Sequence, residues 1–145
     1  MIEVIQNKDG ITIYRSVERE KKSRSENCEQ IDLNFHCARL WPAEYKSMWH
    51  TVNESGASGS VRYGAELNKR GRKKGVSDWI VAVPKNGFHG LFVELKKEGK
   101  DASPISKEQR DFLLCQQQLD YKCAVAYGYK AALKAIDDYL LTGRI

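Results

Sequence analysis

Long apolar runs, paired cysteines and low-complexity tracts are missing from this 145-residue sequence. No stretch approaches the roughly 20 apolar residues that cross a membrane, and the N-terminus has no basic segment followed by a long apolar run, so we expect neither a membrane span nor a secretory signal. The four cysteines form no C-x-x-C pair, and the three histidines do not fall at zinc-finger spacing. We therefore expect a cytoplasmic protein with reduced, mostly buried thiols and no structural zinc.

The composition is that of a globular protein. Hydrophobic residues make up 41% of the chain and charged residues 30%, which argues against disorder. A chain of this length forms one ordinary domain and buries roughly two thirds of its unfolded surface, so it needs no disulfide or metal to fold. The sequence contains no internal repeat.

Positive charge is concentrated in residues 62–74. This segment holds six basic residues and one acid, an excess equal to the net charge of +5 of the whole chain. Such a run is either a solvated, charged helix end or the footprint of a protein that binds a polyanion such as nucleic acid. The basic residues are Arg62, Lys69, Arg70, Arg72, Lys73 and Lys74.

The periodicity of apolar residues predicts an α/β fold, a mixed sheet with helices packed on it. Residues 1–15 alternate around a turn-type sequence, which predicts a hairpin, and charged residues then link it to the rest. We divide the chain into residues 1–24, hairpin and linker, and residues 25–145, the main domain. Helices are expected at 25–41, 60–70, 106–119 and 129–141, and strands at 47–52, 78–83, 90–96 and 121–127.

The first expected helix carries its apolar face on Cys28, Ile31, Phe35 and Ala38, with Leu33 or Leu40 as further members. Ser25 is a suitable N-cap for it. We also expect all three tryptophans in the core; they are Trp41, Trp49 and Trp79.

A carboxylate and a lysine end one of the buried strands. Side chains two apart in a strand share a face, so Glu94 and Lys96 point the same way and Leu95 points to the other side. Charges at the end of an apolar strand are costly to desolvate. The pair is therefore either a simple ion pair or part of a reactive site.

Asp78 favours the second interpretation. It begins the preceding strand, and if residues 84–87 turn the chain, it meets Glu94 at one edge of the sheet. Two close carboxylates repel each other unless a cation lies between them. Oxygen ligands suit Mg²⁺ or Mn²⁺, which could polarise a phosphate and acidify a water, while Lys96 orients or deprotonates that water.

Five segments in order resemble the VRR-NUC (virus-type replication-repair nuclease) domain of the PD-(D/E)xK superfamily, which has a restriction-endonuclease-like core. The resemblance covers about residues 25–141, and the length is similar to that of small stand-alone phage versions. One departure is Ser77, which occupies the proline position of the P-D motif. The five segments are 50–54 (HTVNE), 69–75 (KRGRKKG), 75–78 (GVSD), 89–96 (HGLFVELK) and 106–109 (SKEQ).

The resemblance implies a role for each matching residue. Asp78 and Glu94 would be metal ligands, together with Leu95, and Lys96 would be the catalytic lysine. A glutamate of the first helix completes the site, for which we expect Glu26 and keep Glu29 as the alternative. Gln109 would support the site or touch the phosphate, unless it is only a capping-box residue.

The sequence thus predicts an endonuclease dependent on Mg²⁺ or Mn²⁺ that cuts DNA. The resemblance implies a 5′-phosphate product and branched replication or repair intermediates, such as Holliday junctions or flaps. Symmetric cutting of a junction suggests a homodimer, and we expect the hairpin at residues 1–15, which lies outside the resemblance, to supply the interface. DNA would lie on Lys69, Arg70, Arg72, Lys73 and Lys74. The rivals are a non-catalytic DNA-binding module that uses the 62–74 segment, and a structural protein whose charges are ion pairs.

Overall fold

The computed structural model describes residues 1–18, 24–51, 61–99 and 102–145. It contains six strands, four α-helices and a short 3-10 helix, η1, in these ranges. The strands are β1 (Ile2–Gln6), β2 (Thr12–Ser16), β3 (Met48–His50), β4 (Trp79–Val81), β5 (Leu91–Lys96) and β6 (Lys122–Tyr127). The helices are α1 (Glu26–Leu40), η1 (Glu44–Ser47), α2 (Val61–Lys69), α3 (Lys107–Gln118) and α4 (Tyr129–Leu140).

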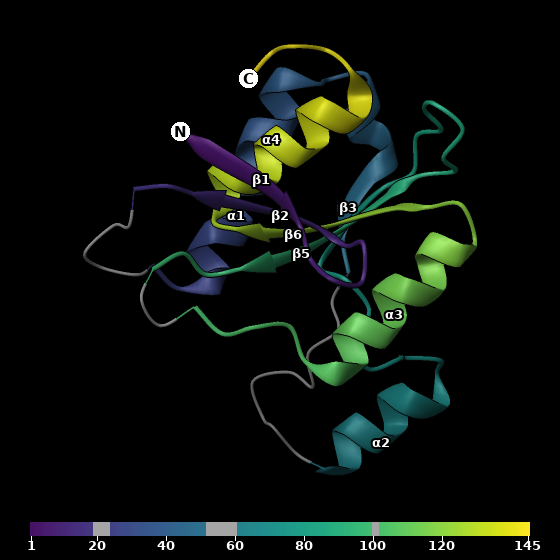
Figure 1. Cartoon of the computed structure of the whole chain (residues 1–145). Helices are drawn as coiled ribbons and strands as arrows, with labels where there is room; N and C mark the ends of the chain where they lie inside the picture. Colours follow the sequence, from purple (N-terminus) through teal and green to yellow (C-terminus); the bar gives the residue numbers. More distant parts are fainter. Residues whose placement is uncertain (19–23, 52–60, 100–101) are drawn as a thin grey trace.

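One mixed sheet forms the centre of the molecule, with strand order β1-β2-β6-β5-β4-β3. The pairs β2–β6 and β5–β6 are parallel, whereas β1–β2, β4–β5 and β3–β4 are antiparallel. Helices α1 and α4 cover one face of the sheet, and α3 covers the other, with α2 beyond it (Figure 1). The expected α/β architecture, including the N-terminal hairpin and the hairpin between β4 and β5, is confirmed.

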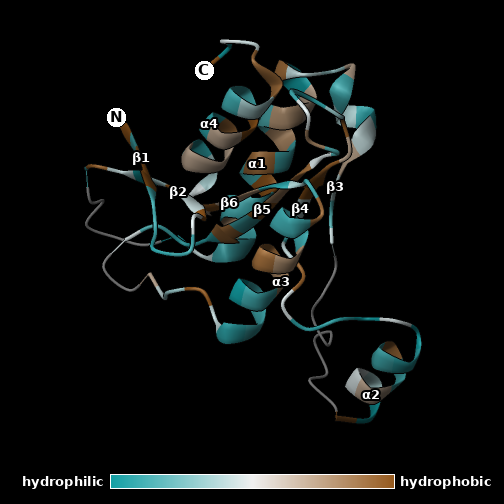
Figure 2. Cartoon of the chain, turned by 45° about the vertical axis from the view of Figure 1, so that its right-hand side comes forward, coloured by the Kyte–Doolittle hydropathy of each residue, from teal (hydrophilic) through white to brown (hydrophobic). Residues whose placement is uncertain are grey.

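Alternation along β5 sends side chains into two separate cores. Leu91, Val93 and Leu95 pack with the residues of α1 and α4 in the larger cluster, and Phe92 packs with Leu113 of α3 in the smaller one. The strands β5 and β6 are mostly hydrophobic, as expected for strands covered on both faces (Figure 2). Glu94 and Lys96 interrupt this pattern on the α3 face, near the end of the strand.

The predicted apolar face of α1 is wrong. Its buried residues are Glu29, Leu33 and Cys37, while Ile31 is 59% exposed and Phe35 is 54% exposed. The physical reason is that Glu29 turns toward the sheet to accept a hydrogen bond from the amide of Tyr129 (2.7 Å). The buried stripe of the helix is therefore Glu29, Leu33 and Cys37, at i, i+4 and i+8. A search for apolar residues misses this stripe because it begins with a glutamate.

Two other burial predictions also need correction. Trp41 and Trp79 are core residues, but Trp49 lies on the edge strand β3 and is 47% exposed. Of the four free thiols, Cys37 and Cys123 are buried, where burial raises the pKa of each to about 12, whereas the two other cysteines, Cys28 and Cys115, are exposed. Only half of the thiols are therefore buried.

The N-terminal hairpin extends the central sheet. Strand β2 pairs in parallel with β6, so β1 becomes one edge of the sheet and β3 the other. Among the described residues, no helix is long and apolar enough to cross a membrane. The division of the chain at residue 24 stays a prediction.

Candidate active site

The antiparallel register of β4 and β5 brings Asp78 beside Glu94. Trp79 pairs with Val93, so the residue before β4 lies next to the residue that follows Val93. The Asp78 carboxylate accepts a hydrogen bond from the amide of Leu95 (2.9 Å), which fixes it against β5. The two carboxylates therefore lie side by side, as predicted, where β4 begins and β5 ends.

Gln109 joins the two charged groups of β5. Its Nε2 donates to Glu94 Oε1, and its Oε1 accepts from Lys96 Nζ (3.0 Å). The same Oε1 accepts from the amide of Ser106 (2.8 Å), while the Ser106 hydroxyl accepts from the Gln109 amide, which completes a capping box at the start of α3. Gln109 is thus a capping-box residue that also bridges Glu94 and Lys96, while its part in the reaction stays a prediction.

Burial raises the pKa of both carboxylates of the site. Burial raises the pKa of Glu94 to about 9, helped by the charge of Asp78 and opposed by Lys96, whose Nζ lies 3.9 Å from Glu94 Oε1. Burial also raises the pKa of Asp78, while the hydrogen bond from Leu95 lowers it. Burial and the neighbouring charge of Asp78 therefore both favour the protonated form of Glu94.

The glutamates Glu26 and Glu29 have different environments although both lie in the first turn of α1. Glu29 is buried, accepts from the Tyr129 amide at the start of α4 and faces Arg24 at 4.0 Å. Glu26 is exposed, and its charge raises the pKa of both Asp78 and Glu94. The charge of Glu26 thus acts on the pair, whereas Glu29 joins α1 to α4; that Glu26 is the helix ligand stays a prediction.

The donor atoms of the site suit a divalent cation such as Mg²⁺ or Mn²⁺. Glu94 Oε2 is buried with no hydrogen-bond partner among the described atoms, which is costly unless another group satisfies it. Carboxylate and carbonyl oxygens are the ligands that these ions prefer. As they lie, however, no three acidic, histidine or cysteine side chains of the described ranges stand close enough to hold an ion. The residues fit the ion chemically, with two carboxylates in contact and Glu26 nearby.

Two residues that the sequence did not assign to the site hold Asp78 in place. The His50 Nδ1 lies 2.8 Å from the main-chain oxygen of Asp78, and the amide of Thr51 donates to that oxygen (2.8 Å). The Thr51 hydroxyl donates to the main-chain oxygen of Ser77. The segment 50–54 belongs to the resemblance to the VRR-NUC domain, but such a resemblance does not show which atoms the segment contacts. Residues 52–54 lie outside the described residues.

The segment that precedes Asp78 packs against the start of α3. Gly75 has a φ of +82°, and a Cβ there would lie 2.3 Å from the main-chain oxygen of Glu108. Only glycine allows this approach. The contact brings the residues before Asp78 beside Gln109, so it aligns two parts of the site.

The predicted DNA-binding residues lie on α2 and the segment that follows it. Lys69, Arg70, Lys73 and Lys74 are exposed. Arg72 differs, because its guanidinium donates to Asn68 Oδ1 (3.0 Å) and to the main-chain oxygen of Gly64 (3.3 Å). Arg72 therefore helps to close α2, and the other four are available to a ligand.

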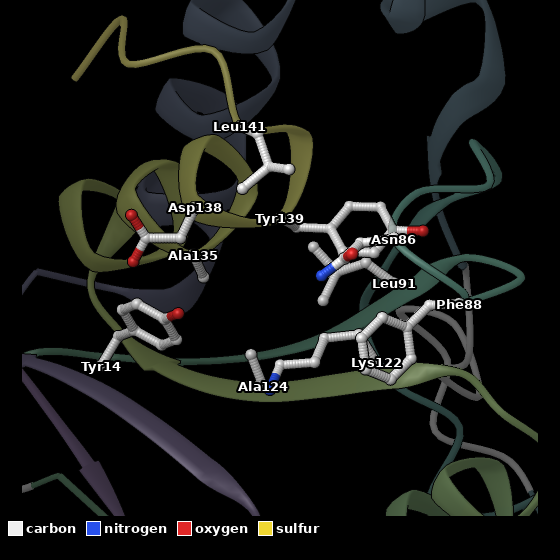
Figure 3. A pocket seen from close by; sticks show the side chains of 10 residues that line it. All are labelled: Tyr14, Asn86, Phe88, Leu91, Lys122, Ala124, Ala135, Asp138, Tyr139 and Leu141. Atoms are coloured by element: carbon white, nitrogen blue, oxygen red, sulfur yellow. The ribbon is translucent and has the colours of Figure 1, made fainter.

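A hollow of about 250 Å³ opens at the opposite end of the sheet (Figure 3). It lies where β5 and β6 begin, at Leu91 and Lys122, whereas the carboxylates lie where β5 ends. Tyr14 lines it, and burial together with Asp138 raises the pKa of the tyrosine. This hollow is thus separate from the cluster around Glu94.

Comparison with known proteins finds no match among protein-family models and none among curated proteins. A solved structure described as a VRR_NUC domain protein superposes with a TM-score of 0.69 at 22% sequence identity, over 84% of this chain and 93% of that one. This likeness concerns the fold and agrees with the resemblance seen in the sequence. The chain therefore has the restriction-endonuclease-like fold of a VRR-NUC domain protein.

Proposed function

We propose that this protein is a divalent-metal-dependent endodeoxyribonuclease that hydrolyses phosphodiester bonds in branched DNA. The observation that carries the proposal is the contact between Asp78 and Glu94 at the end of β5, with the partnerless Glu94 Oε2 and the amine of Lys96 beside it. A fold shared with a VRR_NUC domain protein supports it.

Asp78, Glu94 and Glu26 would hold Mg²⁺ or Mn²⁺, with the main-chain carbonyl of Leu95 as a further oxygen ligand. The ion supplies Lewis acidity toward the scissile phosphate and lowers the pKa of a water. Because burial raises the pKa of Glu94, a proton would compete with the ion for this carboxylate.

Lys96 would act on the attacking water or on the phosphate oxygens. The lysine is only 8% exposed, and Gln109 accepts a hydrogen bond from its Nζ. This bond fixes the amine beside Glu94 and leaves its remaining N–H groups for a substrate oxygen. Gln109 is thus a positioning residue that holds a catalytic lysine and a metal-binding glutamate at once.

The exposed cations Lys69, Arg70, Lys73 and Lys74 would bind the DNA backbone, and Arg72 would join them through its charge. Phosphate contacts fix the register of a protein on DNA without reading sequence. The segment runs into Gly75 and Asp78, so a backbone held there would lead toward the carboxylates.

Branched substrates are the finer part of the proposal. A resolvase cuts two strands symmetrically, which requires two active sites and suggests a homodimer. Within the described part of the chain, β1 is an edge strand of the sheet, and an edge strand can pair with the same strand of a second copy. We therefore propose the N-terminal hairpin as the dimer contact.

The test is an incubation of the purified protein with labelled four-way-junction, 5′-flap, single-stranded and plain duplex DNA in Mg²⁺, Mn²⁺ or EDTA. We expect cleavage only with metal, with 5′-phosphate products, and the order of rates separates a junction resolvase from a flap nuclease.

Absence of cleavage by the folded protein, with DNA binding retained in EDTA, would overturn the proposal. It would favour the rival interpretation, a DNA-binding module that uses the basic segment.

A further inference from the structure

A shallow groove of about 440 Å³ lies between α1 and the edge strand β3. Its helix wall is a single stripe at i, i+3, i+4 and i+7, which places three amide side chains and one exposed isoleucine in a row. The stripe consists of Asn27, Gln30, Ile31 and Asn34. Met48, His50 and Trp79, which share the α1 face of the paired strands β3 and β4, contribute to the opposite wall.

The groove adjoins the segment that carries Asp78. Asn27 follows Glu26 in the first turn of α1, and Trp79 follows Asp78 at the start of β4. His50, which also lines the groove, contacts the main-chain oxygen of Asp78 at 2.8 Å. A DNA strand whose phosphate reaches the carboxylates would therefore place a neighbouring nucleotide in this groove.

The chemistry of the lining suits a nucleobase and not a phosphate. No lysine, arginine, aspartate or glutamate is among its described lining residues. Amides offer both donors and acceptors, as the edges of bases require, and apolar or aromatic surfaces receive the flat face of a base.

Two donors in this lining lack an acceptor. Gln30 Nε2 and Trp79 Nε1 are buried and have no hydrogen-bond partner within the described part of the chain. Such groups are destabilising unless something satisfies them. A carbonyl oxygen or ring nitrogen of a base that enters between α1 and β3 is a suitable acceptor.

We infer that the groove between α1 and β3 binds an unpaired nucleotide next to the scissile phosphate. A base exposes its face and its Watson–Crick edge to a protein only when it is unpaired and unstacked. This inference rests on the proposed nuclease function and deepens it, because it explains how the site would select branched or single-stranded DNA over plain duplex.

The experiment uses a 5′-flap DNA with 2-aminopurine at the first unpaired nucleotide, and a plain duplex with the same label in a paired position. Binding is followed in EDTA by fluorescence, so no cleavage is needed. We expect the protein to change the fluorescence of the unpaired label, and Gln30→Ala and Ile31→Ala to weaken flap binding about tenfold, a loss of the size expected for contacts to one base. Duplex binding should weaken by a much smaller factor.

Phe35→Ala is the matched control, since Phe35 is exposed on α1 but does not line the groove. It should bind both DNAs like the wild type, and thermal melting should show that all variants fold. Equal effects of the groove variants on flap and duplex, or no effect on either, would overturn the inference.

The same variants separate this inference from the proposed function. If the wild type cleaves no DNA but the groove variants still bind the flap less tightly than it does, the proposed nuclease activity is contradicted and the groove inference stands. If the wild type cleaves in Mg²⁺ and the groove variants cleave flap and duplex at unchanged relative rates, only the groove inference is contradicted.

Discussion

Glu94 combines two opposed requirements in one side chain. It is buried beside a second carboxylate, so its protonated form is favoured, yet the proposed reaction needs it ionised on a metal. Gln109 and Lys96 hold one of its oxygens and leave the other without a partner. The proton and the cation are therefore competitors for the same place.

This competition predicts a pH dependence of stability. The folded pKa of Glu94, about 9, lies above its ordinary value of 4.5. Its contribution to stability is thus complete below pH 4.5 and is lost as the pH rises toward 9. We expect the melting temperature of the metal-free protein to fall across this window, and Glu94→Gln to flatten the fall.

Melting curves from pH 5 to 9 in EDTA give the measurement. An identical slope in wild type and Glu94→Gln would mean that Glu94 is not the group that titrates.

The glutamates of α1 provide a matched pair within one turn. Because Glu29 accepts from the Tyr129 amide while buried, Glu29→Gln should destabilise the fold by roughly 1–3 kcal/mol. Glu26 is exposed, so Glu26→Gln should change stability by less than about 0.5 kcal/mol and lower the metal-dependent rate roughly 10–100-fold.

Denaturant unfolding and cleavage rates of both variants decide this assignment. The opposite result, with activity lost in Glu29→Gln at unchanged stability, would return Glu29 to the metal site.

Residues that depend on strand alternation could be predicted from the sequence. Glu94 and Lys96 share a face because they are two apart, and Asp78 joins them because a short turn fixes the register. The face of α1 could not be predicted in this way. Its most informative buried residue is a glutamate, and nothing local shows that the partner of Glu29 is an amide 100 positions away.

Secondary-structure elements position the site through main-chain contacts. The segment before β4 reaches the first turn of α3 because Gly75 has no side chain, and the same turn carries Gln109. Gly75 therefore connects the segment that carries Asp78 to α3, whose Gln109 holds Lys96 and Glu94.

Gly75→Ala should disturb both stability and activity. The new Cβ would lie 2.3 Å from the Glu108 oxygen, so the start of α3 has to shift. The positive φ adds a cost of about 1–2 kcal/mol. Gly87→Ala is the control, since Gly87 has a φ of +84° but open space around its Cβ position.

We expect Gly87→Ala to show only the conformational cost and to keep the cleavage rate per folded molecule. Cleavage rates and unfolding curves of the two variants check this. Equal activity in both would mean that the contact between residue 75 and α3 does not position the site.

At the scale of the whole molecule, the basic segment and the proposed active site lie on elements that follow each other along the chain. The basic segment lies on α2 and after it, beyond α3, and it leads through Gly75 to Asp78 (Figure 1). The groove between α1 and β3 lies on the face of the sheet that α1 covers, and it adjoins Asp78 through His50. The sequence showed the basic segment as a run, but not the groove, because its walls come from separate elements.

DNA binding should therefore depend steeply on salt through the basic segment. Each phosphate contact contributes about 0.9 to the slope of log K against log salt concentration. The double variant Lys73→Ala/Lys74→Ala should lower this slope by about two. Lys8→Ala, on the exposed turn between β1 and β2, should leave it unchanged.

DNA affinities measured by fluorescence anisotropy in EDTA, between about 50 and 200 mM salt, give the slopes. The affinity of a protein that contacts several phosphates changes strongly over this range. A double variant with the wild-type slope would place the DNA elsewhere on the molecule.

The central claim is that Asp78, Glu94 and Lys96 form a metal-dependent hydrolytic centre. Its most direct test is the single-turnover cleavage rate of a labelled 5′-flap by Lys96→Ala and Lys97→Ala, each with Mg²⁺ and with EDTA. Lys97 is the matched control because it is the next lysine along the chain and makes none of the contacts described for the site. We predict that Lys96→Ala lowers the Mg²⁺-dependent rate roughly 10²–10⁴-fold at unchanged DNA affinity, and that Lys97→Ala cleaves like the wild type. Cleavage by a folded Lys96→Ala at the wild-type rate, or wild-type cleavage that persists in EDTA, would contradict it.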